Sequence, residues 1–138
     1  MPRYSVQPHV GLFKHRSTIP QAGDGVFTKC RLNKETHLGY YMGRIFWKYP
    51  KRNKRNFDYI MQISRRPPWI PRSTWESKKT NCVVVDGNNI LAYFNDGDQS
   101  GQTNCRFTQS GRFVTNRCIE PGEELFVSYG EDYWNSDV

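Results

Sequence analysis

Three short segments of the sequence carry residue types that can build a binding or catalytic site. Residues 23–27 (Gly-Asp-Gly-Val-Phe) place two glycines around one residue, which lets the backbone turn tightly and approach a ligand closely. Residues 87–95 end in an asparagine and are followed by Asn104. Residues 120–134 contain a Pro-Gly turn, a strand pattern and an aromatic cluster. Taken singly, these segments are also typical of an ordinary turn, a helix with its loop and the packed end of a hairpin.

The elements that must position these residues are mostly short strands. Runs rich in β-branched and aromatic residues predict extended segments at 10–14, 25–29, 38–47, 57–63, 83–86, 112–116 and 125–128. Apolar residues at i, i+1 and i+4 predict one short helix at 89–95. Three prolines within five residues predict that 64–81 is an irregular insertion without a helix. The sequence therefore predicts a single, mostly-β domain over residues 1–138.

The charge distribution, the cysteines and the absence of long apolar runs limit which partners and ligands the sequence predicts. The net charge is +7, but residues 119–138 contain six acidic residues and no Lys or Arg. This C-terminal segment suits a cationic partner, whereas the rest of the chain is strongly basic. The four cysteines stand singly, without a C-x-x-C pair, so no metal site is expected. No apolar run is long enough to span a bilayer and no signal-peptide pattern begins the chain, so no membrane partner is expected.

Read in order, the three segments resemble the SET-domain family. That family has G-x-G-[VF] near its start, R-F-[IV]-N-H-S-C-x-P-N in its middle, and G-E-E-L-x-x-x-Y followed by aromatic residues near its end. The sequence has G-D-G-V at 23–26, N-D-G at 95–97 with six residues between Gly97 and Asn104, and G-E-E-L-F-V-S-Y at 122–129. The aromatic end is most similar to the small stand-alone SET proteins of large DNA viruses. G-Y-Y-M-G-R at 39–44 also suits the PR-type SET domains attached to zinc-finger arrays.

The resemblance implies a fold of several small β-sheets with a C-terminal pseudoknot and little helix, and it implies S-adenosyl-L-methionine as the cofactor. The implied cofactor-binding residues are Gly23, Asp24, Gly25, Asn95, Asp96 and Trp134. Asn95 would meet the amino group of the cofactor, and Asn104 would brace the loop. Asp96 stands where the family has a His that acts largely through its backbone. Trp134 is explained equally well by stacking on the adenine and by packing under the C-terminal end.

The same resemblance implies a protein-lysine N-methyltransferase with Tyr129, Tyr59 and Tyr133 as catalytic residues. The Tyr129 hydroxyl would lie at the inner end of a lysine channel and orient the target nitrogen, with Tyr59 and Tyr133 as channel walls. Tyr59 is equally typical of a core strand. The implied substrate is a basic, histone-like protein tail. Such a peptide would lie against 57–63 and the 64–81 insertion as an extra strand, with the acidic C-terminal segment suited to its Arg- and Lys-rich flanks. Such an enzyme regulates chromatin in the nucleus, or in the host nucleus if the chain is viral.

Two other functions fit the same sequence. A catalytically weak SET-like protein-interaction module is favoured by the altered N-D-G at 95–97. Nucleic-acid binding is less favoured, since the basic run with interleaved aromatics is also typical of a solvated loop. That run contains Arg44, Trp47, Lys48, Tyr49, Lys51, Arg52, Lys54 and Arg55. The sequence leaves open the oligomeric state, with a dimer possible, the target lysine and the number of methyl groups added.

Overall fold

The computed structural model describes residues 5–47, 61–78, 82–85, 89–98 and 100–128. The elements in these ranges are β1 (Leu12–Arg16), β2 (Asp24–Thr28), β3 (His37–Tyr40), β4 (Arg44–Phe46), β5 (Met61–Ile63), α1 (Arg72–Lys78), β6 (Cys82–Val85), the 3-10 helix η2 (Ile90–Tyr93), β7 (Asn95–Asp96), β8 (Cys105–Phe107), β9 (Arg112–Thr115) and β10 (Glu124–Val127). The mostly-β fold class with several small sheets is confirmed. Neither of the two helices in the described ranges is long and apolar enough to cross a membrane.

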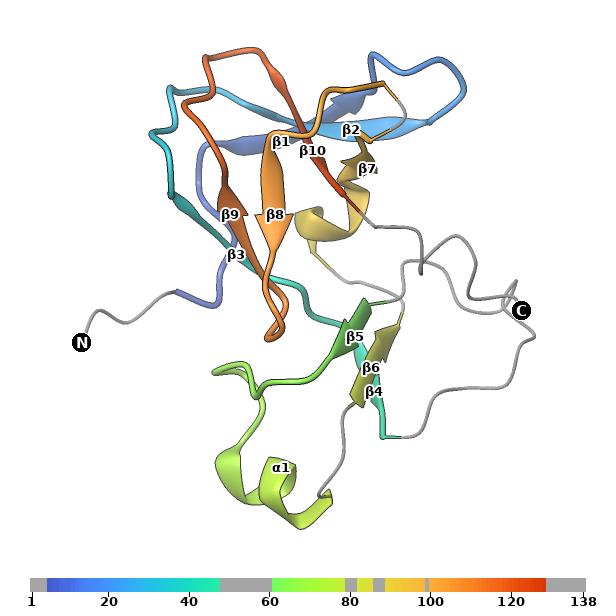
Figure 1. The fold of residues 1–138 in the computed structure, drawn as a ribbon, viewed down its shortest axis with the longest axis vertical. Coiled ribbons are helices and arrows are strands. Elements are labelled where there is room, and N and C mark those ends of the chain that lie inside the picture. Colours follow the sequence, from blue (N-terminus) through green and yellow to red (C-terminus); the bar gives the residue numbers. More distant parts are fainter. Residues whose placement is uncertain (1–4, 48–60, 79–81, 86–88, 99, 129–138) are drawn as a thin grey trace.

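The strands form three small sheets, with the third sheet and α1 at one end of the molecule (Figure 1). Their strand orders are β1-β2-β10-β7, β3-β9-β8 and β4-β6-β5. Strands pair antiparallel except β10 and β7, which run parallel. Because β2, β7 and β10 each carry part of one sequence motif, the first sheet brings all three motifs together.

The β1–β2 hairpin presents the first motif at its turn. Leu12 lies opposite Thr28 and Arg16 opposite Asp24, so the strands pair along their whole length. The chain then closes through a hydrogen bond of 2.8 Å from the Ser17 N–H to the Gly23 carbonyl oxygen. Gly23 has a φ of +74°, a left-handed conformation that glycine adopts without steric cost. The first glycine of the motif is therefore required by the turn itself.

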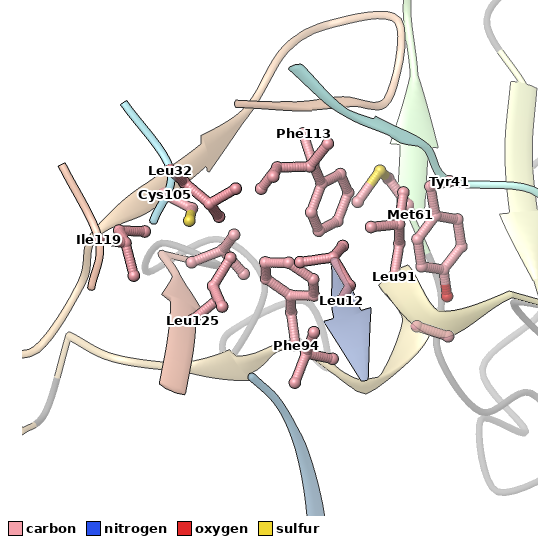
Figure 2. Packing of buried hydrophobic residues seen from close by; sticks show 14 of the residues in the cluster. Leu12, Leu32, Tyr41, Met61, Leu91, Phe94, Cys105, Phe113, Ile119 and Leu125 are labelled. Atoms are coloured by element: carbon pink, nitrogen blue, oxygen red, sulfur yellow. The ribbon is translucent and has the colours of Figure 1, made fainter. Parts of the chain in front are cut away.

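Aromatic side chains from distant segments pack the core between the sheets. Phe113 of β9 is fully buried, and its ring centroid lies 5.0 Å from that of Phe94 and 5.7 Å from that of Phe107. Figure 2 shows Leu12 and Leu91 converging on the same cluster. Offset and edge-on ring contacts add specific attraction to the burial of apolar area. This cluster packs β9 and η2 against β1 of the first sheet.

One expectation from the sequence is wrong, because the segment 64–81 contains the helix α1. All three prolines precede the helix, and the Trp75 N–H donates to the Pro71 carbonyl oxygen at 3.0 Å to begin it. A proline just before or at the first helical position gives up an N–H that has no helical acceptor. Trp75 packs edge-on against Trp47, with ring centroids 5.8 Å apart, and so attaches α1 to the chain that follows β4.

The helix expected at 89–95 is confirmed as a single 3-10 turn, η2. Asn89 caps it, since the Asn89 Oδ1 accepts a hydrogen bond of 3.0 Å from the Leu91 N–H. Leu91 and Ala92 are buried, and the chain then extends at Phe94 into β7. The short helix therefore sets the direction in which Asn95 enters the first sheet.

Candidate functional site

The structure brings the first two sequence motifs into contact. β2 begins with Asp24 and Gly25, β7 consists of Asn95 and Asp96, and β10 lies between the two strands. The Asn95 Nδ2 donates a hydrogen bond of 3.1 Å to the Asp24 carbonyl oxygen across a sequence separation of 71 residues. Outside the described residues lie Tyr59, Tyr129, Tyr133, Trp134 and residues 48–55 of the basic run.

The neighbours of Asn95 fix the orientation of its side-chain amide. Its Nδ2 donates to the Asp24 carbonyl oxygen and, at 3.3 Å, to Oε2 of Glu124. A carbonyl oxygen and an ionised carboxylate only accept hydrogen bonds, so the amide nitrogen must face them. The Asn95 Oδ1 is therefore directed away from both, and no described residue donates a hydrogen bond to it. An amide oxygen left in this way can accept a hydrogen bond from a ligand.

Glu124 is a buried carboxylate at the centre of this arrangement, with only 6% of the residue exposed. Its Oε1 accepts hydrogen bonds from the N–H and the hydroxyl of Thr18, at 2.8 and 2.7 Å. Its Oε2 accepts from the Ser17 hydroxyl at 2.7 Å and from Asn95. No Lys, Arg or His among the described residues forms an ion pair with it. Neutral donors alone therefore stabilise this buried negative charge.

Sequence reasoning missed Glu124 because it looked like one more acid in an acidic segment. Its two hydroxyl donors come from the β1–β2 turn, 106 and 107 positions earlier in the chain. The available signal was its place as the first residue of the run E-L-F-V, all four of which are buried. A charged residue that opens a buried strand needs internal hydrogen-bond donors.

The two glycines of the first motif serve different purposes. A Cβ on Gly23 would meet no atom of the described residues within 4 Å, so these residues leave the backbone open on that side. A Cβ on Gly25 would lie 2.1 Å from Oε2 of Glu124 and 3.2 Å from Nδ2 of Asn95. Gly25 is therefore required by the Glu124 carboxylate, whereas the backbone at Gly23 has room for a ligand to approach.

Asn104, which the resemblance places as a brace of the loop, is bonded to β10. It is 2% exposed, its Nδ2 donates to the Glu124 carbonyl oxygen at 2.9 Å, and its Oδ1 accepts from the Phe126 N–H at 2.8 Å. The Asn104 N–H also donates to the Phe126 carbonyl oxygen at 3.1 Å. Asn104 thus bonds to β10 as a neighbouring strand would, which fixes the backbone that carries the Glu124 carboxylate.

The loop after β7 holds the chain that leaves β10. The Asp98 carboxylate accepts hydrogen bonds from the Ser128 hydroxyl and, at 2.7 Å, from the Thr103 hydroxyl. These bonds, that of Ser128 first, hold the pKa of Asp98 below its usual value. Ser128 directly precedes Tyr129 in the sequence. The chain is therefore anchored at the residue before the predicted catalytic tyrosine.

The described part of the site contains groups that can bind a ligand. It combines an amide oxygen at Asn95 to which no described residue donates, backbone at Gly23 that is clear of the described residues, and a buried carboxylate at Glu124. Such groups suit a ligand that carries an ammonium or another cationic centre. Within the described ranges, no three His, Cys, Asp or Glu side chains lie close enough together to hold a metal ion.

Comparison with known proteins identifies the family. The family model for the SET domain matches residues 23–130. The chain belongs to the SET-domain family. Among solved structures, the methyltransferase domain of human PR domain-containing protein 2 is similar, with a TM-score of 0.60 and 19% identity over 88% of this chain and 79% of that one. The comparison with curated proteins finds no match.

The likeness to the PR-type domain shows that the two chains share the SET fold, while closeness to viral SET proteins stays a prediction. Proteins of the SET-domain family are typically protein-lysine methyltransferases, and these use S-adenosyl-L-methionine. The matched range of this SET domain begins at Gly23 and ends at residue 130. It therefore contains the first two sequence motifs and the third as far as Gly130, Tyr129 included.

Proposed function

We propose that this SET domain is an S-adenosyl-L-methionine-dependent protein-lysine N-methyltransferase that acts on a basic protein tail, in the first instance a histone tail. The observation that carries the proposal is the orientation of Asn95. Its Oδ1 is available as an acceptor, and its Nδ2 bonds to Asp24, the residue after the open backbone at Gly23. An amide oxygen accepts hydrogen bonds from an ammonium group, which the methionine moiety of the cofactor offers.

The residues present fit the cofactor. When bound, S-adenosyl-L-methionine supplies an activated methyl group with its own leaving group, so the protein supplies placement and charge. Asn95 and the backbone at Gly23 and Asp24 would hold the methionine moiety. Asp96 would contribute its backbone, since its Oδ1 accepts a hydrogen bond of 2.9 Å from the Asp98 N–H within its own loop. Trp134 would stack on the adenine.

The target lysine must be neutral when it reacts. With a pKa of about 10.4, only about one lysine in a thousand is neutral at pH 7.4, a cost of about 4 kcal/mol. An apolar, aromatic channel lowers this cost by desolvating the ammonium. We assign the channel walls to Tyr59 and Tyr133 and the orientation of the nitrogen to the Tyr129 hydroxyl. A phenol is a weak base at neutral pH, so orientation suits Tyr129 better than proton abstraction.

A basic tail is complementary in charge to the acidic C-terminal segment, and it could bind beside the edge strand of the third sheet. β5 is the last strand in the order β4-β6-β5, so an extended peptide can add beside it. The Glu120 side chain is 59% exposed and pairs with Arg31 at 3.6 Å, a surface ion pair that contributes little and can exchange for a lysine or arginine of the tail. A histone substrate would place the protein in the nucleus.

The test incubates the chain with methyl-labelled S-adenosyl-L-methionine and core histones. We expect wild type to label histones and Tyr129→Phe to lose about tenfold or more of the rate with unchanged cofactor affinity. Asn95→Ala should weaken cofactor binding in calorimetry, whereas the surface variant Asn116→Ala should not. The proposal fails if wild type neither labels a histone nor binds the cofactor. A fully active Tyr129→Phe variant overturns only the assignment of Tyr129.

A catalytically weak interaction module is the second candidate, favoured by one observation. Asp96 stands where the family has a histidine. This alternative predicts negligible affinity for S-adenosyl-L-methionine together with retained binding to a basic tail. The same calorimetric titration therefore separates the two functions.

A further inference from the structure

We infer that the buried Glu124 carboxylate is a specificity determinant of the cofactor site, and that it favours the cationic sulfonium cofactor over its neutral thioether product. The inference rests on the proposed function, because it needs a sulfonium cofactor at Asn95. It concerns the charge of this carboxylate, an effect separate from the hydrogen bond by which Glu124 helps to orient the Asn95 amide.

Glu124 lies directly behind the groups expected to touch the cofactor. Its Oε2 is 3.3 Å from Nδ2 of Asn95, the amide whose oxygen is proposed to accept from the cofactor. It also sits against the backbone of the first motif, since a Cβ on Gly25 would lie 2.1 Å from the same oxygen. The carboxylate is thus separated from the ligand side of the site by one amide group and one strand backbone.

The charge on Glu124 is not compensated by a cation among the described residues. Its donors are the Thr18 N–H, two hydroxyls and the Asn95 amide, all of which are neutral. Both of its oxygens accept from N–H groups that can only donate, which is the pattern of an ionised carboxylate. By contrast, the adjacent Glu123 pairs with Arg117 at 3.1 Å. The field of a buried, unpaired charge is screened less than that of a surface ion pair and extends into the neighbouring site.

The cofactor and its product differ in net charge, and the field of Glu124 acts on that charge. S-Adenosyl-L-methionine carries a sulfonium, an ammonium and a carboxylate, for a net charge of +1. S-Adenosylhomocysteine has lost the methyl group and the sulfonium charge, so its net charge is zero. The adenosine and amino-acid parts are the same in both, and their contacts cancel in a comparison of affinities. A negative charge behind the site therefore strengthens binding of the cofactor relative to the product.

The experiment measures the dissociation constants of S-adenosyl-L-methionine and S-adenosylhomocysteine by calorimetry for wild type, Glu124→Gln and Glu123→Gln. We expect the preference for the cofactor over the product to fall by about threefold to tenfold in Glu124→Gln. It should stay unchanged in Glu123→Gln, which removes an equal charge that Arg117 already balances. A purely structural role of Glu124 would weaken both ligands equally, and an unchanged ratio in Glu124→Gln would overturn the inference.

A measurement on wild type alone covers the case in which Glu124→Gln does not fold. It uses an S-adenosylhomocysteine analogue with a protonated amine at the methyl position of the sulfonium. We expect this cationic analogue to bind more tightly than S-adenosylhomocysteine, and equal binding of the two would overturn the inference while leaving the proposed function intact. Failure of wild type to bind any of the three ligands would instead overturn the proposed function, and the inference with it.

Discussion

Substitution of Gly25 by alanine tests why this motif glycine is needed. The new Cβ would lie 2.1 Å from Oε2 and 2.9 Å from Cδ of Glu124, whereas ordinary van der Waals contact begins at 3.4 Å. One of the two groups must therefore move by about 1.3 Å. The Glu124 carboxylate cannot withdraw that far and keep its hydrogen bonds of 2.7–2.8 Å to Ser17 and Thr18.

The expected cost follows from those bonds. Loss of two hydrogen bonds to a charged group costs about 1.5 to 3 kcal/mol each. Alanine regains about 0.5 to 1 kcal/mol over glycine within a strand. The free energy of unfolding of Gly25→Ala should thus fall by about 3 kcal/mol, which lowers the Tm by about 10 °C in a domain of this size. Urea and thermal unfolding, followed by circular dichroism without any cofactor, measure both quantities.

A double-mutant cycle supplies the control. In a Glu124→Ala background the Cβ at position 25 has room, so Gly25→Ala should cost less than about 0.5 kcal/mol there. A different result would be that Gly25→Ala unfolds at the same urea concentration as wild type and that only the cofactor affinity of the variant falls. Gly25 would then serve the approach of the ligand, and the steric clash with Glu124 would be the wrong explanation for this glycine.

Three further changes probe the surrounding frame. Asn104→Ala removes a buried amide that bonds two backbone groups of β10, and it should destabilise the fold by about 2 to 4 kcal/mol in urea unfolding. Asn116→Ala, whose side chain only accepts from an exposed arginine, should cost less than about 0.5 kcal/mol, and equal losses would contradict the bracing role of Asn104. Burial holds the pKa of His37 below 6.5, so the unfolded chain binds a proton first and stability should fall as the pH drops below about 6.5. A His37→Gln variant should show a smaller loss between about pH 7.5 and 5.5, and an identical loss would rule His37 out as the cause. Asp96→Asn keeps the acceptor for the Asp98 N–H and should unfold like wild type. Asp96→Ala removes that acceptor and should lower the free energy of unfolding by about 1 kcal/mol. Equal stability of the two variants would show that this hydrogen bond does not hold the turn.

Most strands are predictable from the sequence because their pattern is local. β1, β2, β6, β9 and β10 all lie within two residues of the predicted segments, in which β-branched and aromatic residues recur. β7 was not predicted, since Asn95 and Asp96 have low strand propensity and pair only because β10 supplies a partner. The sequence prediction misses α1 because it uses the number of prolines in 64–81 and not their positions relative to the helix start. Their position before Arg72 permits a helix that the same residues inside it would forbid.

Site residues can be predicted from the sequence only where the residue types and spacing within one motif mark them. The glycines at 23 and 25 and the asparagines at 95 and 104 stand out as residue types at a fixed spacing. The reason for Gly25 was not visible, because the atom it avoids belongs to Glu124, about a hundred residues later. Glu124 in turn is bonded to hydroxyls of Ser17 and Thr18, which no local pattern marks. Long-range side-chain contacts of this kind exist only once the sheet has brought the segments together.

The altered centre of the middle motif is best understood as one coordinated change. A Cβ on Gly97 would lie 2.6 Å from Cβ of Phe126 and 2.7 Å from the backbone nitrogen of Thr103, so glycine is required where the longer loop folds back over β10. That loop closes on itself through a hydrogen bond of 2.8 Å from the Gln102 N–H to the Gly97 carbonyl oxygen. It returns the chain to Asn104, which bonds β10 on both sides of Leu125. The glycine and the six-residue loop after it therefore preserve the bracing of the site, and the loss of the family's histidine leaves the orientation of the Asn95 amide intact.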